Sequence, residues 1–385
     1  MTKKGRFAHI SDCHIGAWRE PALRDTNDRA FGNAIDLCIE NNVDFVIISG
    51  DIFDTGLPEM SSVRSAVRKL RELNQKDIPT YVVYGSHDYS PTTVSVVEVL
   101  TSAGLFVNVG EHAVLEEGGD LELRLVIDEK TGAKIGGLPA RRGGLEKKFY
   151  DREKEMHFSD ADENSYSVFV FHASVNELQS LNIPIEQNIS IQQLPKGFSY
   201  YAGGHIHKRS QGNLNGSPVI YPGPLFGTSF PDLELIARGE NRGFALIDFD
   251  GAKTAGFRFV DLSLPRVLLK SIAADSKSIA QVEEEISDFT SRDSLGVSNS
   301  ILLLKVRGTL SSGRPSDIDW YEYRRKLLGR GASVVNINRA GLFSQESKKL
   351  LLLGAETREE IESKLLEKRL KDYKPQTQDL VALSS

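Results

Sequence analysis

The sequence predicts an α/β protein with two β-sheets flanked by helices, followed by a small α/β domain and a helical tail. Three observations support this. Between residues 4 and 263, short apolar runs typical of strands alternate with amphipathic stretches typical of helices. Five apolar runs end in Asp or His, as strands do where a site lies at the carboxyl edge of a sheet. Beyond residue 265 the order of elements changes.

The first domain, residues 1–263, begins with alternating strand and helix candidates, which indicates βαβ units and a parallel sheet. In chain order these are 7–11, 29–41, 45–49, 60–74, 81–84 and 93–103. Residues 121–138 are rich in strand formers, and the charged segment 140–162 is expected to be a surface excursion. The later apolar runs are expected to be antiparallel strands that close the second sheet. They are 218–221, 243–248 and 256–260.

Residues 264–342 are predicted to form a separate small domain with β-α-β-α-β order. Its strand and helix candidates are 267–272, 279–289, 301–306, 320–328 and 333–337. The remaining segment, 343–385, is predicted to be a tail with one amphipathic helix. Its start is marked by Thr357-Arg358-Glu359-Glu360, which fits a capping box.

Composition narrows the function. The chain has 385 residues, 40% of them apolar and 26% charged, which is ordinary for a globular protein. It shows neither a run of about 18 apolar residues nor an apolar signal core, so we expect a cytoplasmic protein without a membrane segment. Two cysteines exclude a disulfide framework and a thiolate metal cluster. A net charge of −6 means that any nucleic-acid contact must come from local patches.

The residues with the strongest chemical signal follow the five strand candidates. They are Asp12 and His14, then Asp51, then Gly85-Ser86-His87-Asp88, then His172, then His205 and His207. Two-residue spacing lets Asp12 and His14 point to one side, with Cys13 directed to the other as a packing residue. Although distant in sequence, these strand ends should be neighbours in space.

Together these positions offer two Asp and four His as metal ligands. Such a set without sulfur suits Mn²⁺, Fe²⁺ or Zn²⁺ better than Ca²⁺. Two cations about 3.5–4 Å apart can hold both oxygens of an in-line displacement at phosphorus. Asp51 is suited to bridge them. His87 then serves as the acid or electrostatic partner of the leaving oxygen, with Asp88 behind it to fix its orientation.

Each motif has a simpler explanation when taken alone. A Gly-Asp pair after a strand is usually a turn, and a buried His is usually a hydrogen-bonded core residue. His9 is expected to pack within the first strand in that way. The metal site is favoured because five of the eight histidines of the chain lie in these strand-end motifs.

At these motifs the sequence resembles the calcineurin-like metallophosphoesterases, whose motifs it matches in order. Within them it is most similar to the SbcD-type nuclease subunits of DNA double-strand-break repair complexes, which work with an SMC-like coiled-coil ATPase. The segment Gly50-Asp51-Ile52-Phe53-Asp54-Thr55-Gly56 and the small domain after Pro265 fit that branch. The resemblance implies a four-layer αββα fold and a Mn²⁺-dependent 3′-to-5′ exonuclease and endonuclease.

Carried over by position, the resemblance assigns two Mn²⁺ sites. Asp12, His14, Asp51 and His207 would hold one ion, and Asp51, Ser86, His172 and His205 the other, with His87 as the catalytic histidine. The family usually has Asn at the position of Ser86, and a hydroxyl is a poorer ligand than an amide oxygen. Ser86 is expected to bind directly, to bind through water, or to weaken the second site. Asp54 departs as well, because some relatives carry His there.

The resemblance also implies partners. They are DNA, an ATPase bound by the C-terminal tail, and a second copy of the chain in a homodimer. A nucleoid-associated location is implied as well. Basic residues that could contact DNA phosphates are Lys208 and Arg209 beside the site, and Arg324 and Arg325 in the capping domain. The alternative function is a phosphomonoesterase or phosphodiesterase acting on small phosphoesters, which would not need residues 265–385.

Overall fold

The computed structural model describes residues 4–90, 94–111, 113–115, 121–141, 147–150, 156–159, 164–178, 188–291 and 296–347. The chain divides into two compact units, Met1–Val267 and Leu268–Ser385. The predicted first boundary, after residue 263, lies close to this division. The predicted tail falls almost wholly outside the described residues, which end at 347.

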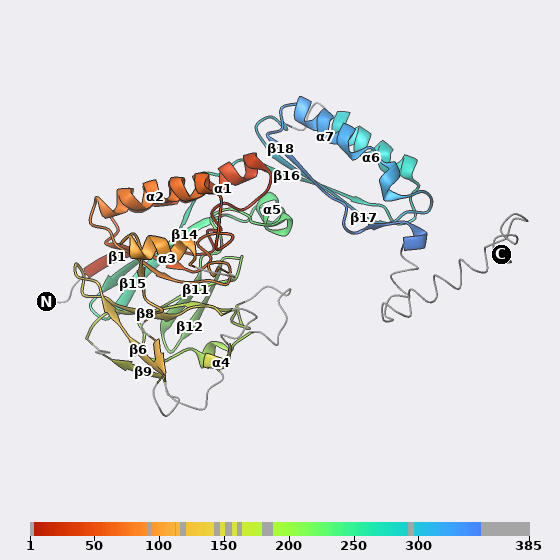
Figure 1. Cartoon of the computed structure of the whole chain (residues 1–385). Helices are drawn as coiled ribbons and strands as arrows, with labels where there is room; N and C mark the ends of the chain where they lie inside the picture. The colour runs from red at the N-terminus through yellow and green to blue at the C-terminus, as the bar shows by residue number, and fades with distance from the viewer. Residues whose placement is uncertain are drawn as a thin grey trace, which may run out of the picture. The chain divides into compact units, whose positions relative to one another are not determined.

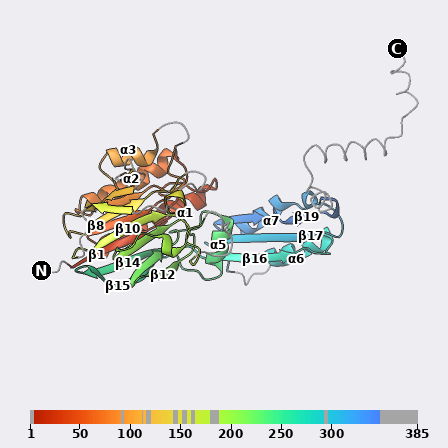
Figure 2. The same cartoon turned by 90° about the horizontal axis from the view of Figure 1, so that it is seen from below.

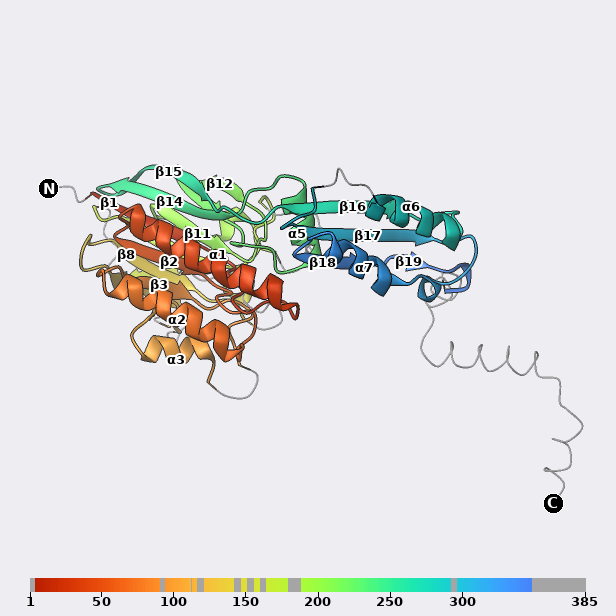
Figure 3. The same cartoon turned by 90° about the horizontal axis from the view of Figure 1, so that it is seen from above.

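The first sheet of unit 1 has six strands in the order β15-β14-β1-β2-β3-β4. Its central strands β1, β2 and β3 are parallel, so their carboxyl ends lie at one edge. Helices α1 and α2 run side by side over this sheet (Figure 1, Figure 3). The elements are β1 Lys4–Ile10, α1 Pro21–Glu40, β2 Phe45–Ser49, α2 Met60–Asn74, β3 Thr80–Val83, α3 Val96–Ser102 and β4 Val107–Asn108.

Helix α1 begins eight residues before the predicted start at residue 29. Pro21 occupies its first turn, where a missing N–H does no harm and the fixed φ suits a helix. The polar residues 24–28 obscured this turn because they interrupt the apolar pattern. Two of them, Thr26 and Asn27, are nevertheless buried, and Asn27 donates to the carbonyl oxygens of Cys13 and His14.

The second sheet has the order β12-β13-β11-β10-β8-β7. Strands β8, β10, β11 and β13 are parallel to one another, and β12 is antiparallel to β13. The elements are β7 Val126–Ile127, β8 Lys134–Leu138, β10 Ser167–His172, the 3₁₀ turn η3 Ile191–Gln193, β11 Tyr200–Gly204, β12 Ser210–Leu214, β13 Ser217–Tyr221 and α5 Phe230–Ala237.

The expectation that the late strands close the second sheet was wrong for two of the three. Strand β14 (Gly243–Asp250) pairs antiparallel with β1, and β15 (Lys253–Asp261) pairs with β14, so both extend the first sheet. Strand β13 does join the second sheet, but parallel to β11. An apolar run indicates a buried strand without saying which neighbour it pairs with, since that depends on contacts distant in sequence.

One apolar core lies between the two sheets. It includes Phe7 and Phe45, which stack with ring centroids 4.9 Å apart, and Val168, Val170 and Ile220 from the second sheet. The outer face of the second sheet is covered by its own apolar cluster, which includes residues of the short helix α4 (Lys147–Tyr150). The predicted excursion 140–162 therefore contributes to packing.

A three-stranded sheet, β5-β6-β9, adds to this side of unit 1. Its strands are β5 Ala113–Leu115, β6 Leu121–Arg124 and β9 Met156–Ser159. Strand β9 pairs parallel with β6. It too comes from the segment expected to be a surface excursion, whose charges hid a short strand.

Unit 2 is a small α/β unit with strand order β16-β17-β18, and β19 pairs with β17. Helices α6 and α7 lie on one face of this sheet (Figure 1), and Figure 2 shows β16 beside β17. The elements are β16 Val267–Ala273, α6 Ile279–Ser291, β17 Ile301–Thr309, the 3₁₀ turn η5 Pro315–Asp317, α7 Trp320–Gly329, β18 Val334–Asn338 and β19 Leu342–Phe343. Across the described ranges of both units, every helix is too short or too polar to cross a membrane.

Candidate metal centre

The five predicted strand ends meet at the edge where the two sheets of unit 1 come together. The loops after β1 and β2 run alongside each other, and the backbone N–H of His14 donates to the carbonyl oxygen of Asp51 at 2.9 Å. Asp12, His14, Asp51 and His205 have positive φ angles of 49°, 42°, 49° and 91°. Side chains other than glycine rarely adopt this conformation, and such strain typically marks functional sites.

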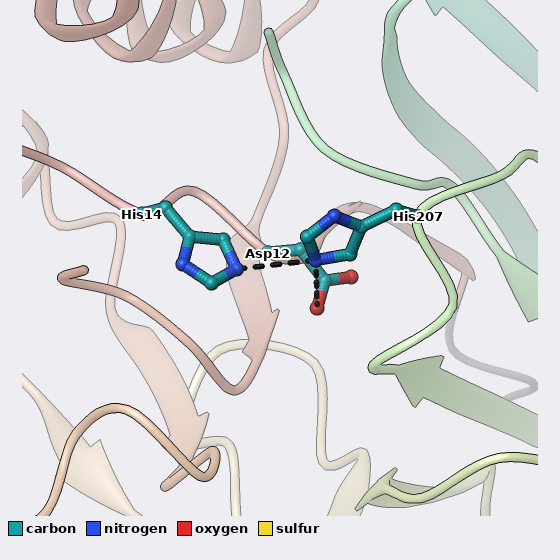
Figure 4. Close-up of side chains that lie close together, drawn as sticks. All are labelled: Asp12, His14 and His207. Atoms are coloured by element: carbon teal, nitrogen blue, oxygen red, sulfur yellow. Dashed lines mark hydrogen bonds and ion pairs between the residues drawn. The ribbon is translucent and has the colours of Figure 1, made fainter. Parts of the chain in front are cut away.

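One group of candidate ligands consists of Asp12, His14 and His207, whose ligand atoms all lie within 4.8 Å of one another. Figure 4 shows the two imidazoles turned toward each other beside the carboxylate. The Nε2 atoms of His14 and His207 are 3.2 Å apart, and His207 Nε2 is 4.0 Å from Asp12 Oδ1. Asp12 is fully buried, so this carboxylate is shielded from bulk water.

A second group consists of Asp51, His172 and His205. His172 Nε2 lies 3.1 Å from Asp51 Oδ2, and its Nδ1 donates to the carbonyl oxygen of Ser49 at 2.9 Å. Asp51 Oδ2 is also 3.6 Å from His14 Nε2. Asp51 thus lies between the two groups, in the position of a bridging carboxylate.

Glycines permit this close approach of loops. A Cβ at Gly85 would overlap the Asp51 carboxylate, and one at Gly204 would overlap the carbonyl oxygen of Ser49. Both glycines belong to the motifs selected from the sequence. Ser86, the expected ligand of the second site, is half-buried in the turn that follows β3.

In the turn after β3, the His87 ring is held by Asp54 and not by Asp88, which was the predicted partner. The His87 ring is exposed, its Nδ1 donates to the carbonyl oxygen of Asp54 at 2.7 Å, and it forms a group of possible ligands with His14 and Asp51. Asp88 is fully buried and accepts the backbone N–H groups of Ile52, Phe53 and Gly85. Asp88 therefore fixes the backbone around Asp51, whereas the Asp54 carbonyl orients the His87 ring.

The buried carboxylates and imidazoles of the centre shift one another's pKa values. Burial alone would lower the pKa of His172, but the Asp51 carboxylate outweighs burial and raises it to about 10. Burial would likewise raise the pKa of Asp51, yet the imidazoles of His172, His14 and His87 hold it well below its usual range. His205 differs, because burial and then the charge of His172 lower its pKa to about 4. Burial and the nearby Asp51 raise the pKa of Asp88 to about 7.

These residues fit divalent cations. Among the described residues, Asp12 Oδ2 and His172 Nε2 are buried without a hydrogen-bond partner, although His172 Nε2 does approach Asp51. Neutral His14 and His207 would also point two lone pairs at each other across 3.2 Å. Unpaired buried polar atoms are costly, and one cation beside Asp12, His14 and His207 with another beside Asp51 and His172 would satisfy them. The mixture of carboxylate and imidazole suits Mn²⁺, Fe²⁺ or Zn²⁺.

The predicted DNA-contacting residues differ in their surroundings. Lys208 is exposed directly after His207. Arg209 is held by Asp261 at 2.7 Å and lies over the Phe259 ring. In unit 2, Arg325 makes two hydrogen bonds with Glu322, while Arg324 lies beside it on α7.

Sequence reasoning missed Asp232 and Arg242, which lie behind the centre. Asp232 Oδ2 is 3.3 Å from His207 Nδ1, and the fully buried Arg242 donates to the carbonyl oxygens of both residues. A signal was present in Ser229-x-x-Asp232, which fits a capping box opening α5. His9, by contrast, was correctly expected to be buried: it contacts Tyr200 and Ser49 within the core.

Comparison with known proteins points to the same chemistry. A family model described as calcineurin-like phosphoesterase matches residues 5–209. "DNA double-strand break repair protein Mre11" of Archaeoglobus fulgidus is 27% identical over 253 residues, which are 63% of this chain and 57% of the relative.

Proteins of the same name occur in other archaea. That of Thermoplasma acidophilum is 26% identical over 313 residues, covering 79% of this chain and 77% of the relative. That of Sulfurisphaera tokodaii is 31% identical over 262 residues, covering 64% and 60%. The chain thus aligns with between 57 and 77% of the length of these three relatives.

Proposed function

The chain belongs to the calcineurin-like phosphoesterase family, and we propose that it is a two-metal nuclease acting on DNA in double-strand-break repair. One observation carries the proposal: three overlapping groups of Asp and His side chains meet where five strands end. The similarity to relatives named for DNA double-strand break repair supports DNA as the substrate. Mn²⁺ is the cation we expect.

The residues of the chain have separate roles in this proposal. Asp12, His14 and His207 would hold one cation, and His172 and His205 the other, with Asp51 between them and Ser86 beside the second. When bound, the two cations would supply Lewis-acid stabilisation of the phosphoryl oxygens and a nucleophilic water at neutral pH.

His87 would donate a proton to the leaving oxygen. A carbonyl oxygen only accepts hydrogen bonds, so the contact with Asp54 requires the proton of the His87 ring to be on Nδ1. That leaves Nε2 as the atom that can gain and release a proton. The exposure of the ring gives it access to a polymeric substrate.

The first test is cleavage of end-labelled duplex and single-stranded DNA in Mn²⁺, Mg²⁺ or EDTA. Cutting that requires Mn²⁺ and is lost in His87→Ala, but not in the control His157→Ala from β9, would support the nuclease and its acid. An inert wild type that hydrolyses small phosphoesters would instead favour the alternative phosphodiesterase. Comparing His87→Ala with His157→Ala distinguishes loss of the proposed acid from a general loss of folding or activity.

Ser86 gives a second test of the metal centre. Asn in its place supplies an amide oxygen, which reaches farther than a hydroxyl and is a better ligand. We expect Ser86→Asn to raise cleavage at low Mn²⁺ and to have little effect at saturating Mn²⁺. Equal activity of the two proteins across the Mn²⁺ range would argue against Ser86 as part of the second site.

The remaining contacts are also proposals. Lys208, exposed next to His207, would meet DNA phosphates beside the metals, while Arg324 and Arg325 would contact DNA from unit 2, the proposed capping domain. Residues 343–385 would bind an SMC-like ATPase, and the nuclease would act as a homodimer.

Deleting residues 348–385 should abolish ATPase binding and leave Mn²⁺-dependent hydrolysis of a small phosphodiester intact. Loss of that hydrolysis in a folded protein would contradict this division of roles.

A further inference from the structure

We propose that Asp232 and Asp54 are positioning residues, which fix the ring orientation and the tautomer of His207 and His14 so that both Nε2 atoms face one cation. The inference rests on the metal centre proposed above and deepens it. It concerns the layer of side chains behind the candidate ligands, where neither carboxylate belongs to a ligand group.

Asp232 is the better fixed of the two. It is 5% exposed, and its Oδ2 lies 3.3 Å from Nδ1 of His207. Thr228 and Ser229 each donate a backbone N–H and a hydroxyl to the same oxygen, over 2.8–3.1 Å. With four donors wrapped around it, the carboxylate cannot turn away from the ring.

Arg242 fixes the same pair through the backbone. Its guanidinium is fully buried and donates to the carbonyl oxygen of His207 at 2.8 Å and to that of Asp232 at 3.3 Å. One rigid planar group therefore spans the residue that carries the ring and the residue that carries the carboxylate. Arg242 therefore fixes the distance between the His207 ring and the Asp232 carboxylate by holding the backbone of both residues.

Asp54 repeats the arrangement on the other ring of the same ligand group. Its Oδ1 lies 3.2 Å from Nδ1 of His14, although its side chain is 36% exposed. A carboxylate only accepts hydrogen bonds, so both rings must carry their proton on Nδ1. Both Nε2 lone pairs then point into the 3.2 Å gap between the rings.

In the second ligand group, the fully buried ring of His172 is held by a backbone carbonyl and not by a carboxylate. Nδ1 of His172 donates to the Ser49 carbonyl oxygen, which is a neutral acceptor. Partners behind a ligating imidazole raise its basicity, and a carboxylate does so through its charge as well as its hydrogen bond. Removing Asp232 should therefore weaken the cation site of Asp12, His14 and His207, and leave the other site nearly unchanged.

The test is a titration of metal-free protein with Mn²⁺, in which the free ion is measured by its paramagnetic resonance spectrum. We expect Asp232→Asn to weaken one class of site by about 10- to 100-fold. The control is Asp248→Asn, which removes a carboxylate from the half-exposed ion pair with Arg6 and should change nothing. Thermal unfolding without metal verifies that each variant is folded.

Combining the substitution with His207→Ala shows whether Asp232 acts through the ring. We expect no further loss when Asp232→Asn is added to His207→Ala. An equal loss in both backgrounds, or no loss in either, would overturn the inference. Should Asp232→Asn fail to fold, Asp54→Asn with His14→Ala provides the same cycle at a more exposed carboxylate.

The readout does not involve DNA, so this inference and the proposed function can fail separately. A wild type that binds Mn²⁺ without cutting DNA would overturn the nuclease, while the cycle still decides the role of Asp232. A wild type that binds no Mn²⁺ would overturn the metal centre and this inference together.

Discussion

At the scale of single residues, the centre depends on buried polar groups whose partners are provided by backbone atoms. Asp88 shows this most clearly, because its carboxylate accepts three backbone N–H groups from the two loops that carry Asp51 and His87. A fully buried carboxylate is tolerated only when it is satisfied in this way. Asp88 therefore contributes to the centre by holding loops in place.

Replacing Asp88 with Asn should lower the free energy of unfolding by about 1–3 kcal/mol, because the amide nitrogen would face a backbone N–H that has no acceptor left. Urea unfolding of the metal-free protein measures this loss. Asp248→Asn serves as the exposed counterpart and should change the free energy by less than about 1 kcal/mol. Equal effects in the two variants would show that burial of the Asp88 carboxylate has no special role.

His9 predicts a dependence of stability on pH. Burial between Tyr200 and Ser49 lowers its pKa to about 3, below the ordinary value of 6.5. Below pH 6.5 the unfolded chain takes up a proton that folded His9 does not. Its contribution to stability is therefore complete above pH 6.5 and is lost as the pH falls toward 3.

We expect the free energy of unfolding of the wild type to fall more steeply than that of His9→Gln, by up to about 1.4 kcal/mol per pH unit between pH 6 and 4. Denaturant unfolding in EDTA at several pH values measures both slopes. Because the two proteins share all other titrating groups, the difference between their slopes reports the contribution of His9. Identical slopes would mean that His9 is protonated equally in both states.

At the scale of elements, the site depends on how closely two sheets approach each other. The end of β2 and the end of β11 come from different sheets, and Gly204 allows the backbone of one to contact the Ser49 carbonyl of the other. That carbonyl also accepts the Nδ1 proton of His172. A change in the distance between the two sheets would therefore displace the His172 ring and alter the metal centre.

Gly204→Ala should cost about 1–3 kcal/mol of stability and weaken Mn²⁺ binding, because its Cβ would overlap that carbonyl oxygen. Gly256→Ala is the matched control, since Gly256 lies in strand β15 with open space around the position of a Cβ. Thermal unfolding and Mn²⁺ titration of both variants test the point. Normal metal binding in Gly204→Ala would show that the sheets can separate without disturbing the centre.

At the scale of the whole molecule, the two units have separate cores. The core of unit 2 is formed between its sheet and its two helices, with Leu302 and Leu304 of β17 and Val282 and Ile286 of α6 all buried. Unit 1 contains all three ligand groups in full. Metal binding is therefore expected to be a property of unit 1 alone.

We expect a fragment of residues 264–347 to unfold cooperatively by itself. Its affinity for Mn²⁺ should be far below that of the full chain. The complementary fragment 1–267 should keep Mn²⁺ binding and hydrolysis of a small phosphodiester. Circular dichroism on heating and Mn²⁺ titration test the two fragments. Failure of a folded fragment 1–267 to bind Mn²⁺ would mean that unit 2 completes the site.

The order of the first three strands and of the helices between them could be predicted because it depends on local patterns, whereas strand β12 and helix α5 were not predicted. The bounds predicted for α2 match those observed, and the five elements predicted in unit 2 lie within a few residues of β16, α6, β17, α7 and β18, whereas the short strand β19 was not predicted. The start of α1 and the strand β9 were missed, since polar residues there hide elements that tertiary contacts stabilise. The partners of β14 and β15 depended on pairing distant in sequence, which a local pattern cannot specify.

The sequence alone was sufficient to select the residues that meet at the centre, because a strand end is a local signal and parallel strands bring such ends to one edge. Only the tertiary structure decided what surrounds them. It placed Asp232, Asp54 and Arg242 behind the imidazoles, assigned the backbone partners of Asp88, and paired Arg209 with Asp261. These contacts join residues from separate loops, so they depend on three-dimensional packing that no local pattern contains.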